Sequence, residues 1–230
     1  MDSQRAKAFL LEQSWLSGTP TEFRDAVVSA CYFRWYDSGQ TVAYAGMKES
    51  GIFAIASGSM AVTSTNGPRD AKLTYIMGPG IWSGMVPLFT GTARTATHVA
   101  RERTLIAHLE SSAIKRMLDE RPVWWRHFGY LATIFSEAVV GFASDLLIQD
   151  NRRRCIAVLL HSANLRWGAV PEGPIIVQVS QDELGAIGGL SRKTVGRVLK
   201  DLERQGLVAV GYREIRIIDP GLLRHIADGD

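Results

Sequence analysis

The sequence has few cysteines and no long hydrophobic run. Only two of its 230 residues are cysteines, Cys31 and Cys155, which is too few for a disulfide framework. We therefore expect a reducing, cytoplasmic environment. No stretch approaches the roughly 18 apolar residues that span a bilayer. Residues 1–11 mix charged side chains with short apolar runs, unlike a secretory signal, so neither a secreted nor a membrane protein is expected.

Catalytic motifs are also missing. The sequence contains no nucleophile elbow, no phosphate-binding glycine loop, no HExxH motif and no recognisable pair of catalytic carboxylates. We therefore expect no enzymatic activity, no catalytic residues and no metal ligands. The formal net charge is +3, from 26 basic and 23 acidic residues. Such a small excess points to a nucleic-acid partner only if the basic residues cluster.

Short apolar runs separated by glycines fill the region from about residue 19 to residue 110. Segments of this kind, with glycine and proline between them, are typical of an antiparallel β-roll or barrel. Turns are expected at Asn66-Gly67-Pro68 and at Gly78-Pro79-Gly80. A short helix is expected before this region, over residues 3–16. The predicted strands are residues 41–44, 52–56, 60–63, 72–77, 95–100 and 104–109.

A long helix is predicted after the strands. Ser111 and Ser112 are candidates to cap a short helix that ends at Leu118. Pro122 suits the first turn of a second helix over residues 123–149. An apolar stripe on this helix has spacings of three and four, which fits either a core face or a dimer seam. The stripe consists of Phe128, Leu131, Phe135, Ala138 and Phe142.

The next segments are shorter. Residues 150–154 are polar and basic, and they are interpreted as a hinge. An apolar helix is expected over residues 155–165, a loop over 167–173 and a strand over 175–179.

Residues 180–207 have the pattern of two short helices joined by a glycine turn. Ser180 and Glu183 form a capping box, which marks the start of the first helix. Gly185 is expected to let the second helix cross closely, and Gly188-Gly189 to break the first helix. Ser191 caps the second helix, and Gly206 ends it. The residues expected on its buried face are Val195, Val198, Leu199 and Leu202. This arrangement is the helix-turn-helix unit.

Basic residues occupy the remaining face of the second helix. Arg192, Lys193 and Arg197 lie early on it, where a recognition helix reaches base edges in the major groove. Lys200, further along the same helix, is also expected to contact DNA. Phosphate contacts are expected from Thr194 and from the capped helix starts at Ser180, Gln181 and Ser191. A β-hairpin over residues 207–218 would form a wing, with Arg213 near its tip. The alternative is an amphipathic helix pair whose basic face is merely solvated.

The segment LSRKTVGRVLKDLERQGLV, residues 190–208, resembles the recognition helix and wing start of the Crp/Fnr family of bacterial transcription regulators. Residues 80–89 and 93–97 are similar to the phosphate-binding cassette of that family. The long helix is similar to its dimerisation helix. The resemblance covers nearly the whole chain; it is most specific in the C-terminal third.

The resemblance implies an α+β fold with a cyclic-nucleotide-binding-type β-roll (residues 1–120), a dimerisation helix (121–150) and a winged helix-turn-helix domain (151–230). It implies a homodimer on a pseudo-palindromic site in double-stranded DNA, with RNA polymerase as a further partner. Arg192, Lys193 and Arg197 fall on the three principal base-reading positions of the family. The middle position is usually Glu, which accepts a hydrogen bond from cytosine. Lys193 cannot accept one, so the half-site preference should differ there.

The resemblance also bears on the ligand of the β-roll. Members that bind cyclic AMP hold its ribose with a Glu in the cassette and its phosphate with an Arg-Ser or Arg-Thr pair. This chain keeps Arg94-Thr95, but Met85 stands in place of the Glu, and Val139-Val140 replace the polar pair that meets the adenine. Cyclic AMP is therefore disfavoured. Arg94 is either an anion ligand or a structural salt-bridge partner in the roll.

Other effectors in this family use metal or thiol chemistry. Two cysteines cannot supply the four thiolates of an iron–sulfur cluster. A haem would need His98, His108 or Cys31 as its axial ligand. Cys155 follows three arginines, so either a lowered thiol pKa makes it an oxidation sensor or it is simply half-buried at a helix start. The favoured interpretation is a collapsed, apolar pocket and a regulator active without an effector, with an effector-gated regulator as the alternative.

Overall fold

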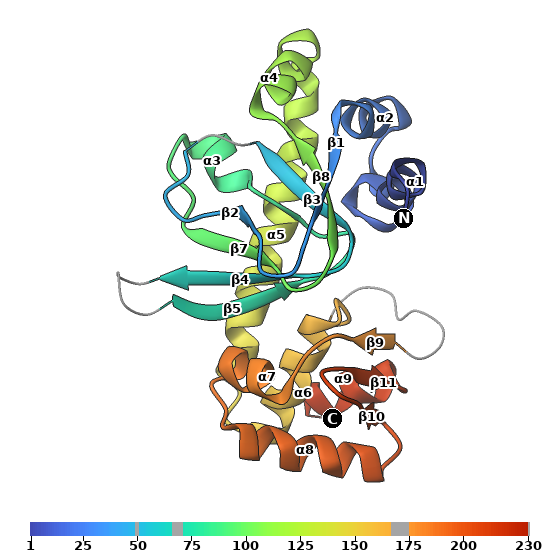
Figure 1. The fold of residues 1–230 in the computed structure, drawn as a ribbon, viewed down its shortest axis with the longest axis vertical. Coiled ribbons are helices and arrows are strands. Elements are labelled where there is room, and N and C mark those ends of the chain that lie inside the picture. The colour runs from blue at the N-terminus through green and yellow to red at the C-terminus, as the bar shows by residue number, and fades with distance from the viewer. Residues whose placement is uncertain (49–50, 66–70, 167–174, 230) are drawn as a thin grey trace. The chain divides into compact units, whose positions relative to one another are not determined.

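The computed structural model describes residues 1–48, 51–65, 71–166 and 175–229. The chain divides into two compact units, residues 1–71 with 76–136 and residues 72–75 with 137–230. Helices and strands are mixed, with a β-sheet region first, a long helix next and a helix-turn-helix last, so the predicted α+β fold is confirmed (Figure 1). The turn expected at residues 66–68 and the loop expected at 167–173 lie outside the described residues.

Helices precede the β-strands. The predicted single helix over residues 3–16 is instead α1 (Ser3–Gln13), capped by the Asp2 side chain, followed by a 3-10 turn, η1 (Trp15–Gly18). A further helix, α2 (Thr21–Ala30), lies in the region that we expected to be strands only. Its buried residues Phe23 and Val27 are four apart, which is helical spacing, but the segment is too short for this signal to stand out.

The β-roll consists of two four-stranded sheets, ordered β1-β8-β3-β6 and β2-β7-β4-β5. The predicted strands are confirmed to within two residues at either end, whereas β1 and β6 were not predicted. Every residue of β8 is buried, so this strand lies in the core of the roll. The strands are β1 (Tyr32–Tyr36), β2 (Thr41–Ala43), β3 (Ile52–Ser57), β4 (Met60–Thr65), β5 (Ala71–Met77), β6 (Trp82–Ser83), β7 (Ala96–Ala100) and β8 (Thr104–Leu109).

Three further helical segments frame the roll and lead out of it. They are α3 (Met85–Thr90), α4 (Ser111–Glu120) and η2 (Pro122–Trp124). The expected capping of α4 by Ser111 or Ser112 is wrong. Glu110 is the N-cap residue, directly after β8, so both serines already lie inside the first turn, and no side chain caps this helix. Pro122 lies in the first turn of η2, as its missing N–H allows.

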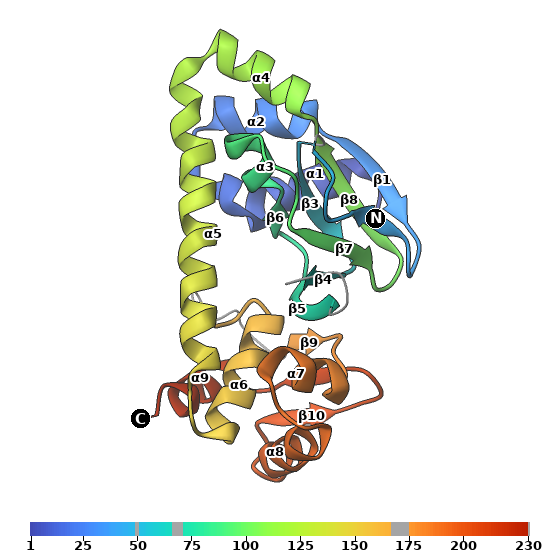
Figure 2. The same ribbon diagram turned by 90° about the vertical axis from the view of Figure 1, so that its left-hand side faces the viewer.

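The long helix α5 (Trp125–Leu146) ends three residues earlier than predicted (Figure 2). Its apolar stripe divides in two. Phe128 and Leu131 are buried, and the Phe128 ring packs on Phe23 with 5.4 Å between the ring centroids. Phe135, further along the stripe, is 38% exposed, and the neighbouring Val139 is 50% exposed. The first half of the stripe is therefore core. In the second half Phe135 and Ala138 are exposed, whereas Phe142 is partly buried against Tyr75 and His161, with 6.0 and 4.7 Å between the ring centroids.

The second unit follows α5 with α6 (Asn151–Ser162). The predicted hinge over residues 150–154 is wrong, because Asp150 caps α6 by accepting a hydrogen bond from the Arg153 backbone N–H at 2.7 Å. The basic residues after it form the first turn of that helix. The remaining elements are β9 (Ile175–Val177), α7 (Gln181–Gly188), α8 (Arg192–Arg204), β10 (Val208–Val210), β11 (Ile215–Ile217) and α9 (Pro220–Asp228).

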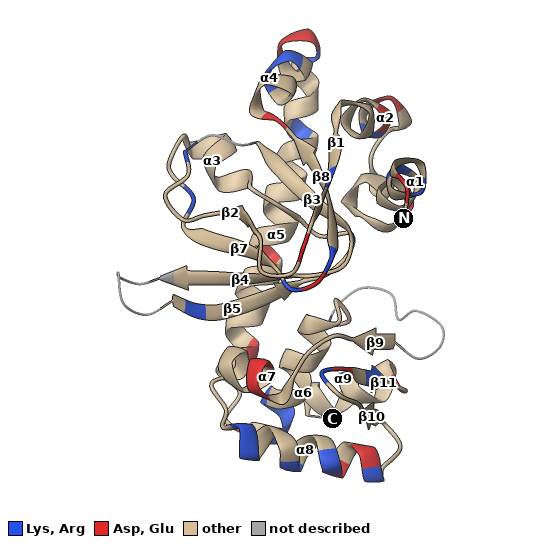
Figure 3. Cartoon of the chain, viewed as in Figure 1, with Lys and Arg blue, Asp and Glu red and all other residues tan. Residues whose placement is uncertain are grey.

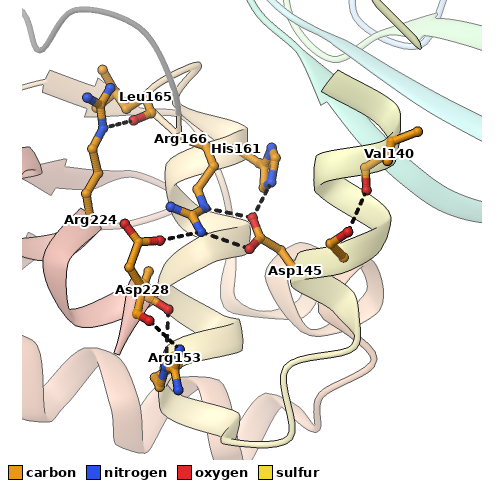
Figure 4. A network of polar contacts seen from close by, with 10 residues as sticks. Val140, Asp145, Arg153, His161, Leu165, Arg166, Arg224 and Asp228 are labelled. Atoms are coloured by element: carbon orange, nitrogen blue, oxygen red, sulfur yellow. Dashed lines mark hydrogen bonds and ion pairs between the residues drawn. The ribbon is translucent and has the colours of Figure 1, made fainter. Parts of the chain in front are cut away.

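A buried carboxylate ties the end of α5 to α6 and α9 (Figure 4). Asp145 accepts two hydrogen bonds from the Arg166 guanidinium, at 2.7 and 2.9 Å, and lies 2.8 Å from His161 Nε2. Arg166 also forms an ion pair with Asp228, at 2.7 Å. Burial alone would raise the pKa of Asp145, but the hydrogen bonds from Arg166 and His161 outweigh it and lower that pKa.

Replacing Asp145 by Ala should therefore destabilise the second unit by about 3–5 kcal/mol, because Arg166 would keep a buried charge without its main partner. Hydrogen exchange of the α6 amides measures the free energy of opening of this unit. Asp201→Ala is the matched control, since it removes a more exposed ion pair with Arg204 and should cost less than about 1 kcal/mol. Equal α6 protection in Asp145→Ala and the unmodified chain would show that the network contributes nothing.

Candidate nucleic-acid interface

The helix α7 begins with the predicted capping box, which is confirmed. The Glu183 N–H donates to Ser180 Oγ at 3.2 Å, and the Ser180 N–H donates to Glu183 Oε2 at 2.8 Å. Two backbone groups that have no partner within the helix are thereby satisfied. Leu184 and Ile187 are buried, as expected, and they hold the helix on the core of the second unit.

The turn between α7 and α8 depends on glycine at two positions. Gly189 ends α7 at φ +60°, a conformation that other residues rarely adopt. Gly185 makes room for the turn itself, because a Cβ atom there would lie 2.7 Å from the Leu190 carbonyl oxygen. Gly185 was expected to admit a crossing helix; the nearest neighbour is the turn backbone, and the next is the backbone N of Arg192, where α8 begins, at 3.6 Å.

The helix α8 has two chemically distinct faces. Ser191 caps it by accepting from the Thr194 N–H at 3.1 Å, and the four apolar residues predicted for its inner face are all buried. Arg192, Lys193, Arg197 and Lys200 are all exposed. Figure 3 shows basic residues gathered along α8. Because the apolar face fixes the rotation of the helix, the basic side chains are held outward together.

The predicted wing is present beside the helix pair. β10 and β11 pair antiparallel, with Val208 opposite Ile217, and β9 joins them on the other side of β11. Arg213 lies in the connection between β10 and β11 at φ +57°, and the neighbouring Tyr212 is 92% exposed. The wing therefore presents a cation and an aromatic ring to solvent.

A hollow of about 520 Å³ lies between the start of α7, the start of α8 and the wing. It brings together four of the predicted DNA-binding residues, namely Ser180, Gln181, Arg192 and Arg213. The others, Ser191, Lys193, Thr194, Arg197 and Lys200, lie along α8 outside the lining of this hollow.

Two acidic residues in the hollow were not predicted. Asp182 lies in the first turn of α7, and its Oδ2 atom is 3.7 Å from Arg192 Nε. Glu214 also lines the hollow and accepts a hydrogen bond from Gln178 Nε2 at 3.2 Å. The signal available in the sequence was the pair Asp182-Glu183, two and three residues after the capping Ser180, which we interpreted only as a helix start.

The predicted ligand residues of the β-roll are divided between the units. Met85 and Arg94 are buried in the first unit, where Arg94 Nη2 donates to the Gly51 carbonyl at 2.7 Å and its guanidinium lies over the Phe53 ring at 5.2 Å. Burial lowers the pKa of Arg94. Thr95 is exposed. Val139 and Val140 belong to the second unit and are 50% and 63% exposed.

The residues suggested as haem ligands and the thiol suggested as an oxidation sensor are all buried. His98 Nε2 lies 3.1 Å from Ser83 Oγ, and His108 Nε2 lies 3.1 Å from the Tyr36 hydroxyl. Burial lowers the pKa of each imidazole to about 4. Burial also raises the pKa of both Cys31 and Cys155 to about 12. The suggested lowering of the Cys155 pKa by its arginine neighbours is therefore wrong, because the thiol is only 1% exposed.

No group of three or more His, Cys, Asp or Glu side chains in the part of the chain that the structure describes is arranged to hold a metal ion. None of the described helices combines the length and apolarity needed to cross a membrane.

Comparison with known proteins gives two family matches and several relatives. A Crp-like helix-turn-helix domain matches residues 153–226, and a cyclic nucleotide-binding domain matches residues 33–121. The chain is 29% identical over 213 residues to the cyclic AMP receptor protein of Thermus thermophilus, covering 92% of this chain and 95% of the relative.

Solved structures agree in fold. FixK2 from Bradyrhizobium japonicum superposes with a TM-score of 0.71 at 15% identity, covering 85% of this chain and 96% of that one. A CRP-family transcriptional regulator from Thermus thermophilus gives a TM-score of 0.64 at 22% identity, covering 85% and 97%.

A β-roll followed by a long helix and a winged helix-turn-helix, with basic residues on the second helix, defines a DNA-binding transcription regulator. Within that class, the chain belongs to the Crp/Fnr family.

Proposed function

We propose that this regulator binds pseudo-palindromic double-stranded DNA as a homodimer, placing α8 of each protomer in successive major grooves. The observation that carries the proposal is the division of α8 into a buried apolar face and an exposed basic face beside the wing. Two recognition helices related by twofold symmetry fit half-sites about one helical turn apart.

The exposed residues of α8 have different roles in this proposal. Arg192, Lys193 and Arg197 read base edges, and arginine favours guanine through its paired donors. Lys200, Thr194 and the capped starts of α7 and α8 contact phosphates, which fix the register on the duplex. Arg213 on the wing adds a phosphate contact. Through these contacts the chain would direct RNA polymerase, the partner expected of a transcription regulator.

The dimer seam is assigned to the second half of α5. Phe135, Val139 and Val140 are 38%, 50% and 63% exposed on this helix in the single chain. Exposing several apolar side chains of one helix to water is unfavourable. A second copy of the helix would bury them.

We further propose that binding is not gated by cyclic AMP. The name of the Thermus relative and the cyclic nucleotide-binding match favour a nucleotide ligand. Against it, Met85 is a buried apolar residue in place of the ribose-binding Glu, and Arg94 already donates to the Gly51 backbone. A ribose without a charged acceptor loses hydrogen bonds worth about 1.5–3 kcal/mol each. Gating by another ligand or by redox state is the second candidate.

Arg197→Ala should weaken binding to the preferred DNA by about 1–3 kcal/mol and relax the preference at one base pair of each half-site. Lys200→Ala is the control, because loss of a phosphate contact weakens all sequences about equally. Anisotropy titrations against single-base variants of the site distinguish the two. If Arg197→Ala also lost affinity equally for every sequence, its assignment as a base-reading residue would be wrong.

Val139→Asp should separate the dimer, because a carboxylate would be buried at the seam without a partner, and DNA affinity should fall with it. Sedimentation velocity measures the oligomeric state. Ser144→Asp is the control, since it adds the same charge to an exposed position of α5 off the apolar stripe. A Val139→Asp protein that remains dimeric would contradict the seam.

A further inference from the structure

The tip of the wing carries an aromatic ring that lies almost entirely in solvent. Tyr212 is 92% exposed, more than any other large hydrophobic side chain in the part of the chain that the structure describes. Packing within the protein therefore does not explain why a tyrosine stands here. Tyr212 lines the hollow together with Arg192 and Arg213, so its ring lies on the surface that we assign to DNA.

The wing is tied to the recognition helix, and this connection fixes where the ring lies. At the end of β10, the Val210 N–H donates to Glu203 Oε1 of α8 at 2.9 Å. The Gly211 N–H donates to the Glu214 carbonyl oxygen at 2.9 Å and so closes the hairpin directly before its tip. Because the wing is joined to α8, DNA that receives α8 in its major groove also meets the tip of the wing.

The backbone at this tip is strained. Arg213 adopts φ +57°, a left-handed conformation that is unfavourable for residues with a Cβ atom and that glycine would adopt without strain. Strained backbone conformations are concentrated at functional sites. The Glu214 carboxylate, next along the chain, accepts a hydrogen bond from Gln178 Nε2 at 3.2 Å. The tip therefore offers DNA a cation and an aromatic ring at adjacent positions.

We propose that Tyr212 is a DNA-binding residue. Its ring packs against a deoxyribose of the strand whose phosphate Arg213 contacts, and its hydroxyl donates a hydrogen bond to a phosphate of that strand. The inference rests on the proposed function and adds to it a contact that the basic residues do not make. Deoxyribose presents apolar C–H groups, which an aromatic ring covers well, and tyrosine hydroxyls are among the donors that bind phosphate oxygens.

Burial of this ring on DNA is opposed by little. Because the ring is already in solvent, it gives up little packing within the protein when DNA covers it. A tyrosine side chain also has few rotatable bonds, so ordering it costs little conformational entropy. Sugar and phosphate are the same at every base pair, so the contact should strengthen binding by the same factor whatever the sequence.

The test uses the full chain and the DNA site that it selects from a randomised pool. Tyr212→Ala removes the ring and the hydroxyl and should weaken binding about tenfold, which equals about 1.4 kcal/mol, for the site and for each single-base variant of it. Tyr212→Phe keeps the ring and should weaken binding about threefold, through loss of one hydrogen bond. Tyr44→Ala is the matched control and should leave the affinity unchanged, because Tyr44 is 55% exposed but belongs to the first unit.

Two further measurements separate this contact from a charge effect. Since Tyr212 is uncharged, Tyr212→Ala should leave the slope of log affinity against log salt unchanged, whereas Arg213→Ala should reduce it by about 1. Hydroxyl-radical cleavage of the bound DNA reports which deoxyriboses the protein covers. Tyr212→Ala should expose one sugar in each half-site that the unmodified chain and Tyr212→Phe both protect, while protection elsewhere in the site stays the same.

Unchanged affinity in Tyr212→Ala would overturn the inference, and the exposed ring would then point to a protein partner. Unchanged sugar protection would overturn the ring contact, and a Tyr212→Phe protein that binds as tightly as the unmodified chain would overturn the phosphate hydrogen bond. If the unmodified chain selects no site, the proposed function fails and this inference falls with it. A chain that selects a site and binds it equally well as Tyr212→Ala refutes only the role of Tyr212.

Discussion

The orientation of α8 depends on its four buried apolar residues, Val195, Val198, Leu199 and Leu202. Their spacing leaves one rotation of the helix that buries all of them, and that rotation turns its basic residues outward together. The turn glycines and the serine caps act on the same element, because they fix where α8 begins. The chemistry proposed for the DNA surface therefore rests on hydrophobic burial on the opposite side of one helix, not on contacts among the basic residues themselves.

The long helix α5 shows how one continuous pattern serves two purposes. Its apolar stripe is uniform in sequence, yet Phe128 is fully buried in the first unit while Phe135, midway along the stripe, is 38% exposed and Val139 beside the stripe is 50% exposed. At its far end Asp145 contacts His161 of α6 and is linked through Arg166 to Asp228 of α9, so the helix is held within the second unit too. A helix anchored at both ends, with an apolar stretch uncovered between them, is suited to pairing with a copy of itself.

Local signals made most of the fold predictable. The capping box at Ser180, the glycine turn and the short apolar runs between glycines act over a few residues, and the structure confirms them. Errors arose where local signals compete. Residues 151–154 are polar enough to suggest a hinge, but the Asp150 cap makes them helical. Asp182 was missed because its partner, Arg192, is brought to it only by the turn. The assignment of ligand-binding residues in the β-roll remains a prediction. Which side chains reach a ligand there depends on tertiary packing, and residue spacing does not reveal that packing.

Selection of DNA from a randomised pool by the unmodified chain, purified without added effector, tests the central claim most directly. The account predicts enrichment of a pseudo-palindrome with half-sites about one helical turn apart and an affinity that falls steeply with salt. Adding cyclic AMP should change neither the sequence nor the affinity. Enrichment of nothing, or of a single half-site bound by a monomer, would contradict the account; a site that appears only with cyclic AMP would contradict its effector-free part.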